Sequence, residues 1–589
     1  MTLEWLSGDG PRRTCPACGA EGVTCAILQV GRPLPRFRLL GCRVCGAAAF
    51  DPPPRPDYAE AAGGGAALAF YLQQGAGLWS IASTLLTLVP YDVEARPRML
   101  EIGCGFGFGL DLARRALGWD VQGHDPSPFA AAGRELLGVP IAPGLFTPDA
   151  ASPGSQDVVL ASEVLEHLHE PASFLATLRG ALRPGGVLAL TTPDLGAVGP
   201  NTPPGLLTPL LSAGYHTVLF TAASLEQALR HAGFTTVAVE SRGAQLLARA
   251  SNGSAAWRDE LPADRAAYRA WLEAAVITQP AGSDLHLGLL GRAWREAVHE
   301  GHVTEADRLF ASLDAALRAR FGQGLEGWAG SATATPDTLE ELVRRQPVAL
   351  GPWLLARGLH RLLRGEPRPG LESLFLAASR HAAGLRAALG RIGSDDGDAE
   401  DAGWVAGAEA VLCAAARGEA GLSRRLEELG DAPGTDPVAS TARAAALRRR
   451  VYVELVNAGA FVAATPLGDT AAQALHRAEA GHEALADGEL DTLWCRAASV
   501  ANAPETGDPA DALRALRALR GASLRRLAMP NLPPGSAAGL LWPGTGLELE
   551  LLRRAGRMTE MAALRREALD TLASRPGVPP PPPGFGNAA

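Results

Sequence analysis

R-M-L-E-I-G-C-G-F-G-F-G, residues 98–109, is the stretch that decides the fold of the first half of this chain. Residues 99–102 form a short apolar run that stops at a glycine, as a buried parallel strand does. Gly103, Gly105 and Gly107 then let the backbone turn sharply and approach a ligand closely, because no Cβ intervenes. The stretch therefore predicts a strand followed by a glycine-rich, ligand-binding turn.

The residues that follow predict a helix and a second strand. Residues 110–117 carry apolar side chains at helical spacing and end before Gly118. Residues 119–123 then return as a strand and deliver Asp125 to the same edge of the sheet. Ligands bind at the carboxyl edge of an open α/β sheet. A carboxylate at that edge can accept hydrogen bonds from both hydroxyls of a ribose.

Strand and helix signals continue to alternate up to residue 250. Helices are predicted at 126–137 and 172–182, and strands at 139–142, 157–161, 187–192, 235–240 and 245–250. Glu101 precedes the first glycine, so the turn reads E-x-G-x-G-x-G. With its motifs in this order, the chain resembles the class I S-adenosylmethionine-dependent methyltransferases, in particular the ubiquinone-biosynthesis and sugar O-methyltransferases. The resemblance implies an α/β Rossmann-like domain with a seven-stranded sheet over residues 98–254. For the glycine turn alone, an enzyme that binds NAD or FAD is the alternative.

The resemblance also implies which residues bind the cofactor, S-adenosylmethionine. Asp125 takes the ribose, and the backbone at Ser162 flanks the methionine amine. The methionine end is held by one acidic residue and three glycines, namely Glu101, Gly103, Gly105 and Gly107.

Two further segments are expected near the cofactor. A helix over residues 66–88 closes over it in methyltransferases of this type, with Tyr71 and Gln74 as candidates to line the site; ordinary packing on the sheet is the alternative. In the loop at 143–156, Leu145 and Phe146 are candidates to cover the adenine. No acidic residue is identified for the adenine amino group.

An E-x-x-E-H run follows the fourth strand. A hydroxyl nucleophile needs a general base or a metal ion to lose its proton. One helical turn can carry Glu163, Glu166 and His167 inward, and His216 arrives from a later loop. Glu166, His167 and His216 are therefore the catalytic candidates. The small-RNA 2′-O-methyltransferases have a similar run, with a later histidine, as a divalent-metal site. This likeness adds a divalent ion at Glu163, Glu166, His167 and His216, with a plain histidine base as the alternative.

Two C-x-x-C-G knuckles lie near the amino terminus and predict a zinc ribbon over residues 1–50. Their ligands are Cys15, Cys18, Cys42 and Cys45. Four thiolates leave no open coordination position, so the zinc is structural. A hairpin is expected over residues 27–40, and Cys25 is expected to be a small core residue. Disulfide pairing is the alternative. A proline-rich stretch begins the linker and helix of residues 51–97.

After residue 254 the sequence changes to Ala, Leu and Arg at helical spacing. A connecting helix is predicted at 255–284, an all-helical region at 285–575 and a disordered tail at 576–589. A glycine, then a small or apolar residue five positions on and Leu eight positions on, recurs at Gly301, Gly459 and Gly556, with weaker copies at Gly365, Gly418 and Gly488. The pattern resembles degenerate tetratricopeptide repeats; an unrelated helical bundle is the alternative. The acidic run at 393–402 predicts a solvated loop.

Composition limits the classes of function. A net charge of −9 makes nucleic acid an unlikely partner. No apolar run reaches membrane-spanning length, and the first residues lack a signal-peptide layout, so a cytoplasmic protein is expected.

The sequence thus leads to one functional hypothesis and two alternatives. The hypothesis is an S-adenosylmethionine-dependent methyltransferase (EC 2.1.1.-) that methylates a hydroxyl of a sugar, glycan or small metabolite. Its helical region would bind a protein partner. The alternatives are a non-catalytic interaction scaffold with a vestigial methyltransferase fold, and an RNA methyltransferase.

Overall fold

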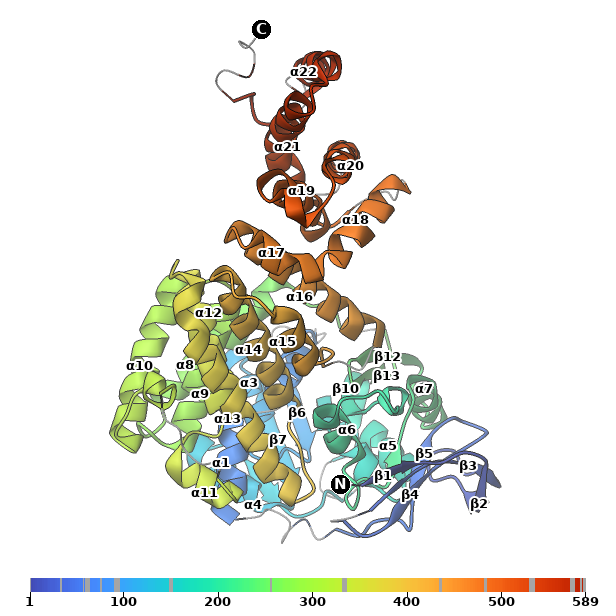
Figure 1. The fold of residues 1–589 in the computed structure, drawn as a ribbon. Helices are drawn as coiled ribbons and strands as arrows, with labels where there is room; N and C mark the ends of the chain where they lie inside the picture. The colour runs from blue at the N-terminus through green and yellow to red at the C-terminus, as the bar shows by residue number, and fades with distance from the viewer. Residues whose placement is uncertain are drawn as a thin grey trace. The chain divides into compact units, whose positions relative to one another are not determined.

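The computed structural model describes residues 2–31, 34–56, 58, 64–74, 77–88, 96–147, 152–254, 257–330, 336–433, 437–480, 485–528, 535–572, 578–582 and 585. The chain forms two compact units (Figure 1). The first comprises Met1–Gly365, Ala377–Gly403 and Pro433–Pro437. The second comprises Glu366–Leu376, Trp404–Ala432 and Val438–Ala589.

A seven-stranded sheet lies in the first unit, in the order β12-β13-β10-β9-β6-β7-β8. Five strands run parallel: β6 (Arg98–Ile102), β7 (Asp120–Asp125), β8 (Ile141–Pro143), β9 (Gln156–Ser162) and β10 (Leu182–Pro193). The hairpin of β12 (Thr236–Arg242) and β13 (Gln245–Ser251) pairs antiparallel with β10. The predicted Rossmann-like sheet of seven strands is thus confirmed.

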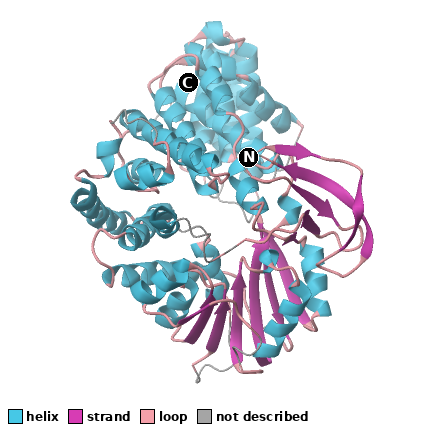
Figure 2. Ribbon diagram, turned by 90° about the horizontal axis from the view of Figure 1, so that it is seen from below, coloured by secondary structure: helices cyan, strands magenta, loops and turns pink. Residues whose placement is uncertain are grey.

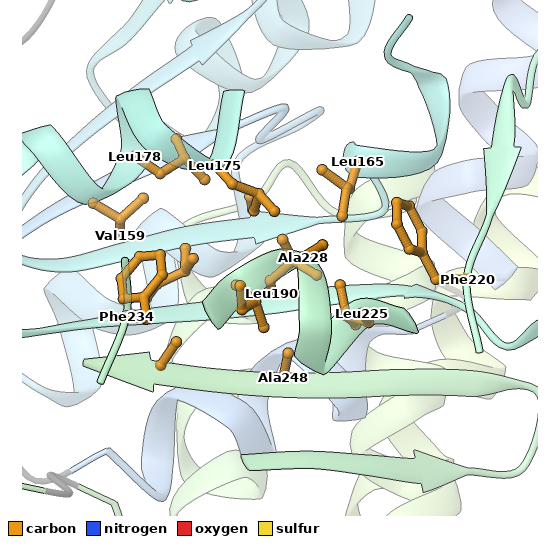
Figure 3. Close-up of a cluster of buried hydrophobic side chains, with 14 of the residues drawn as sticks. Val159, Leu165, Leu175, Leu178, Leu190, Phe220, Leu225, Ala228, Phe234 and Ala248 are labelled. Carbon is orange, nitrogen blue, oxygen red and sulfur yellow. The ribbon is translucent and has the colours of Figure 1, made fainter. Parts of the chain in front are cut away.

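Helices connect the strands and cover the sheet: α3 (Phe108–Ala116), α4 (Pro128–Leu137), α5 (Pro171–Ala181) and α7 (Ala222–His231). Figure 3 shows side chains of α5 and α7 packed against β9 and β10. Leu175, Leu190 and Leu225 are fully buried there. Burying one such side chain contributes roughly 1.5–3 kcal/mol.

Two predicted segments are divided differently in the structure. The helix expected at 66–88 is two helices, α1 (Gly64–Gln74) and α2 (Leu78–Leu86). Gly77, which precedes α2, has φ 74°, a left-handed conformation that favours glycine. The later loop from which His216 was expected to arrive is preceded by a further helix, α6 (Pro204–Leu211).

A second sheet occupies the amino terminus (Figure 2). Its strands are β1 (Leu3–Trp5), β2 (Asp9–Thr14), β3 (Glu21–Val30), β4 (Phe37–Gly41), β5 (Ala48–Asp51) and β11 (Val218–Leu219). β11 comes from the same stretch of chain as the seven-stranded sheet and pairs antiparallel with β5. The amino-terminal sheet therefore extends past the predicted boundary at residue 50.

Helices after residue 254 belong to the same unit as the seven-stranded sheet: α8 (Pro262–Ile277), α9 (Asp284–His299), α10 (Val303–Phe321), α11 (Leu339–Arg345) and α12 (Leu350–Leu363). Trp271 Nε1 donates to Asp111 Oδ2 at 3.0 Å. A Cβ on Gly288 would lie 2.1 Å from the carbonyl oxygen of Leu72 in α1. Helices α8 and α9 thus pack on the sheet domain. The boundary between the two units lies further along the chain, within the predicted helical region of 285–575.

The acidic run expected to be a solvated loop at 393–402 is instead packed in the first unit. Asp396 is buried, and Asp398 forms a bidentate ion pair with Arg295 at 2.8 Å. Glu400 accepts a hydrogen bond from the backbone nitrogen of Gly205 at 3.0 Å. These partners compensate the carboxylates, which is why the run can fold into the start of α14.

The remaining helices are α13 (Glu372–Arg391), α14 (Gly397–Ala416), α15 (Leu422–Leu429), α16 (Pro437–Asn457), α17 (Phe461–Ala464), α18 (Asp469–Glu479), α19 (Asp487–Asn502), α20 (Pro509–Leu527), α21 (Gly535–Arg554) and α22 (Met558–Leu572). Gly301, Gly459 and Gly556 have positive φ and stand between helices, as the repeat pattern predicts, whereas Gly488 lies inside α19. A tetratricopeptide architecture stays a prediction. Most of the predicted tail lies outside the described residues.

None of the helices in the described part of the chain combines the length and apolarity needed to cross a bilayer.

Candidate active site

The glycine-rich turn connects β6 to α3 in the predicted way. Gly103, Gly105 and Gly107 have φ of 67°, 50° and 88°, which side chains with a Cβ rarely adopt. A Cβ on Gly103 would lie 2.4 Å from Val164 Cγ2. The turn therefore touches the segment that follows β9, and parallel β6 and β9 bring their carboxyl ends together.

Asp125 lies at the end of β7 and is aimed at this turn. Its Oδ2 accepts from the backbone nitrogen of Gly105, and its Oδ1 from that of Ser127, each at 2.7 Å. Each carboxylate oxygen keeps a second lone pair. Asp125 is thus fixed in orientation and can still accept hydrogen bonds from a ribose.

Glu101 lies in the strand under the turn and is almost fully buried. Burial, with the nearby Asp125, raises its pKa to about 8. Its Oε2 has no hydrogen-bond partner among the described residues. Because an unpartnered buried acceptor is costly, this oxygen fits a cationic ligand group such as the methionine ammonium. Gly109 leaves room for the carboxylate, since a Cβ there would lie 2.7 Å from it.

Tyr71 of α1 covers the turn. Its ring stacks on Phe108 and Phe129, with centroids 6.1 and 5.2 Å away, and its hydroxyl would lie 3.2 Å from a Cβ on Gly105. Gln74 lines a separate cavity beside Trp79 and Tyr268.

Three other residues that were predicted near the cofactor, Ser162, Leu145 and Phe146, differ in their contacts and exposure. Ser162 shares a 2.7 Å hydrogen bond between its hydroxyl and that of Thr191. The ring of Phe146 packs edge-on against His124, with centroids 5.3 Å apart, whereas Leu145 is exposed.

Glu166, His167 and His216 form a compact cluster. One ligand atom from each lies within 4.8 Å of the other two. Glu166 Oε1 is 3.6 Å from His167 Nε2 and 4.0 Å from His216 Nε2. Thr192 donates to the other oxygen, Oε2, at 2.9 Å. The structure thus brings together the three residues that the sequence singled out as catalytic candidates.

Backbone carbonyls assign the protonated nitrogen of both histidines. His167 Nδ1 lies 3.2 Å from the carbonyl of Tyr215, and His216 Nδ1 lies 3.0 Å from that of Leu210. A carbonyl only accepts, so the contact of His216 places the hydrogen on Nδ1 and leaves a lone pair on Nε2, and the Tyr215 carbonyl favours the same arrangement in His167. Glu166 Oε1 has no hydrogen-bond partner among the described residues.

Three potential ligand atoms therefore face one another in the cluster. Burial, followed by the nearby Glu163, raises the pKa of Glu166. Burial, followed by His167, lowers the pKa of His216 to about 3. Two imidazoles held through Nδ1, and one carboxylate, are a donor set that fits a divalent cation.

Two neighbours of the cluster depart from the sequence prediction. Glu163 is not a member of it: its φ of 55° turns the backbone, its side chain is exposed, and it accepts from Gln245 at 2.8 Å. Tyr58, which the sequence did not single out, places its hydroxyl 2.9 Å from His167 Nδ1. It lies in the linker before α1, so no local motif connects it to His167.

The four knuckle cysteines also meet. Their sulfurs all lie within 4.8 Å of one another, with Cys15–Cys45 at 3.7 Å and Cys18–Cys42 at 3.9 Å. Four sulfurs about 2.3 Å from a zinc ion stand about 3.8 Å apart in a tetrahedron. The described cysteines therefore have the right spacing for zinc.

Comparison with known proteins gives a partial match. Residues 77–239 match a family described as a methyltransferase domain. A probable S-adenosylmethionine-dependent methyltransferase of Mycolicibacterium smegmatis is 36% identical over 140 residues, which cover 23% of this chain and 51% of that protein. A ubiquinone biosynthesis O-methyltransferase of Methylobacterium sp. is 40% identical over 101 residues, 16% of this chain and 40% of that protein.

Solved structures align over a similar share of the chain. An O-methyltransferase family protein from Burkholderia thailandensis aligns with a TM-score of 0.26 and 20% identity, over 32% of this chain and 59% of that one. The chain thus spans about half or less of the curated relatives it matches. Residues 77–239 are thus similar to the methyltransferase domain of this family, and part of the chain is similar to S-adenosylmethionine-dependent methyltransferases.

Proposed function

We propose that this protein transfers the methyl group of S-adenosylmethionine to a hydroxyl of a sugar, glycan or small metabolite. The observation that carries the proposal is the cluster of Glu166, His167 and His216 at the carboxyl edge of the sheet, joined to the glycine turn through Val164. A buried cluster of two imidazoles and one carboxyl group beside a cofactor turn suits the removal of a hydroxyl proton. The O-methyltransferase relative is consistent with this choice.

Methyl transfer from a sulfonium needs the nucleophile and the methyl carbon held close and in line. Asp125 and Glu101 would orient the two ends of the cofactor. A divalent ion held by Glu166, His167 and His216 would lower the pKa of the acceptor hydroxyl. The carbonyls of Tyr215 and Leu210 keep both Nε2 atoms unprotonated for this role.

A metal-free version of the reaction uses His167 as the general base. Its side chain is 23% exposed, compared with 7% for His216, so His167 is the histidine that an acceptor reaches. Its Nε2 takes the proton, and Glu166 stabilises the imidazolium.

The four cysteines are proposed to bind one structural zinc ion. Gly19 and Gly46 follow the knuckles with φ of 72° and 80°, which closes each turn around its sulfurs. The ion would brace the amino-terminal sheet rather than take part in the reaction.

Calorimetry with S-adenosylmethionine tests the cofactor site. Asp125→Ala should weaken affinity roughly ten- to hundred-fold, because charge-assisted hydrogen bonds worth roughly 1.5–3 kcal/mol are lost. Asp120→Ala, at the exposed start of β7, is the matched control. Unchanged affinity in Asp125→Ala would show that the ribose is held elsewhere, and a wild type that binds no cofactor would favour the scaffold.

Manganese titration of zinc-replete protein tests the cluster. Glu166→Gln and His216→Ala should abolish binding of one manganese ion, with the exposed Glu135→Gln unaffected. His167→Ala should reduce methyl transfer far more than cofactor affinity. No manganese binding, together with chelator-resistant transfer, would leave His167 as a plain base.

A further inference from the structure

We propose that a cavity under the amino-terminal sheet binds an uncharged, apolar part of the methyl acceptor. The inference rests on the proposed function and adds the chemical class of the acceptor. The cavity has a volume of about 460 Å³, within the usual range for small-molecule sites.

The cavity walls come from the amino-terminal sheet and from the segments that carry the catalytic cluster. Val23, Leu40, Val44 and Phe50 supply apolar surface from the sheet side. His169 and Thr217 line it from the other side. The cavity therefore belongs jointly to the cysteine-bearing sheet and to the methyltransferase domain.

The charged side chains on the cavity wall are paired with one another or with a neighbour. Arg13 forms an ion pair with Asp51 at 3.1 Å, and Arg43 pairs with Asp9. Arg38, outside the cavity, also contacts Asp51 at 2.8 Å. These side chains already have partners of opposite charge, so a charged ligand would find no unpaired counter-charge among them, and the cavity favours an uncharged group.

Exposed apolar residues at the cavity provide surface that an apolar group can bury. Val44 is 70% exposed and Val23 is 37% exposed, although both are apolar, and both line the cavity. A ligand that covers them removes this surface from water, which is the main driving force for apolar association.

The cavity wall is bonded directly to the backbone of the cluster. Thr217 donates from its backbone nitrogen to the carbonyl of Glu166 at 2.6 Å, and from its hydroxyl to the carbonyl of His167 at 3.3 Å. Its own carbonyl accepts from the nitrogen of Phe50 at 3.0 Å. Thr217 therefore ties the cavity wall to the backbone of Glu166 and His167, and it directly follows His216 in the chain.

The test uses N-phenyl-1-naphthylamine, a neutral apolar dye, with the full-length protein. Saturable fluorescence enhancement is expected, and it should weaken at least roughly ten-fold in Val44→Asp, which adds a charge, and in Ala49→Leu, which fills volume. Val462→Asp, at a position outside the cavity that is 64% exposed, is the matched control. Circular dichroism and cofactor calorimetry should be unchanged in all three variants.

Competition then tests the class of ligand. The neutral 4-hexylphenol should displace the dye, and 4-hydroxybenzoate at the same concentration should not. Absence of saturable dye binding, wild-type affinity in both cavity variants, or equal displacement by the acid would overturn the proposal. Failure of the wild type to bind S-adenosylmethionine would instead overturn the proposed function, because dye binding does not depend on the cofactor.

Discussion

At the scale of single residues, Tyr58 is the neighbour of the cluster that most directly sets the state of His167. Its hydroxyl lies 2.9 Å from Nδ1 and its ring meets the imidazole edge-on, with centroids 5.5 Å apart. Burial, followed by the nearby Glu166, raises the pKa of Tyr58 to about 12, so the hydroxyl stays protonated near neutral pH. Its oxygen can share the Nδ1 hydrogen with the carbonyl of Tyr215.

Tyr58→Phe should therefore weaken manganese binding by roughly ten-fold or more, as loss of a partner behind a metal-ligating histidine does. Cofactor affinity should not change. Tyr215→Phe is the matched control, because Tyr215 contacts His167 through its backbone carbonyl and not through its hydroxyl. Equal manganese affinity in both variants would show that Tyr58 only fills space.

Glu101 should give the cofactor-free protein a characteristic pH dependence. Its pKa rises from 4.5 to about 8 on folding, because of burial and Asp125. Below pH 4.5 both states hold the proton and there is no penalty. Between 4.5 and about 8 the unfolded chain releases a proton that the folded chain keeps, so stability falls as pH rises.

Glu101→Gln has no ionisable carboxyl group at this position. Its melting temperature relative to wild type should therefore increase across that pH range and level off above it. Differential scanning calorimetry of the cofactor-free proteins measures this difference in melting temperature, with the exposed Glu135→Gln as control. A difference independent of pH would mean that Glu101 is ionised in the folded protein.

At the scale of secondary-structure elements, the pairing of β5 with β11 links the cysteine cluster to the candidate active site. Val218 and Leu219, which follow His216 closely, pair with Ala49 and Ala48. Cys15 and Cys45 pack against the same core as Phe220. Disorder of the knuckles would therefore reach the strand that positions His216.

Metal analysis should find close to one zinc per chain, lost in a Cys15→Ser/Cys42→Ser double variant. Hydrogen exchange of the amides in β11 should then accelerate, because β5 loses its support. Cys25→Ser is the control: its sulfur faces the carbonyl of Gly41 at 3.4 Å and is not in the cluster. A zinc-free wild type with a protected β11 would contradict both expectations.

These elements also show what sequence reasoning reached and what it missed. The glycine turn, Asp125 and the seven strands were predictable because their signals are local periodicities and turn residues. Tyr58 and β11 were not, since each acts through a partner distant in the chain. Glu163 was assigned to the cluster by helical spacing, but the backbone turns at that residue before a short 3-10 helix begins.

At the scale of the whole molecule, the helices after residue 254 complete the first unit. Tyr268, Trp271 and Leu272 of α8 are buried, and Glu400 bonds to the backbone of α6. A chain truncated after residue 254 should aggregate, because this apolar surface becomes exposed, whereas one ending after residue 403 should stay soluble. Size-exclusion chromatography and cofactor calorimetry compare them. A monomeric, cofactor-binding 1–254 fragment would show that the sheet domain needs no helical cover.

The close packing of Gly288 against Leu72 affects how freely α1 can move. Gln73, next in α1, donates to Asp284 at 2.6 Å and accepts from the backbone nitrogen of Val348 at 2.8 Å. Any outward swing of the helix that carries Tyr71 breaks both bonds and opens the packed Gly288 contact. In the proposed reaction, release of spent cofactor by such a movement would require α1 to separate from α9 and from the chain around Val348, so residues distant from the cluster would influence the rate of product release.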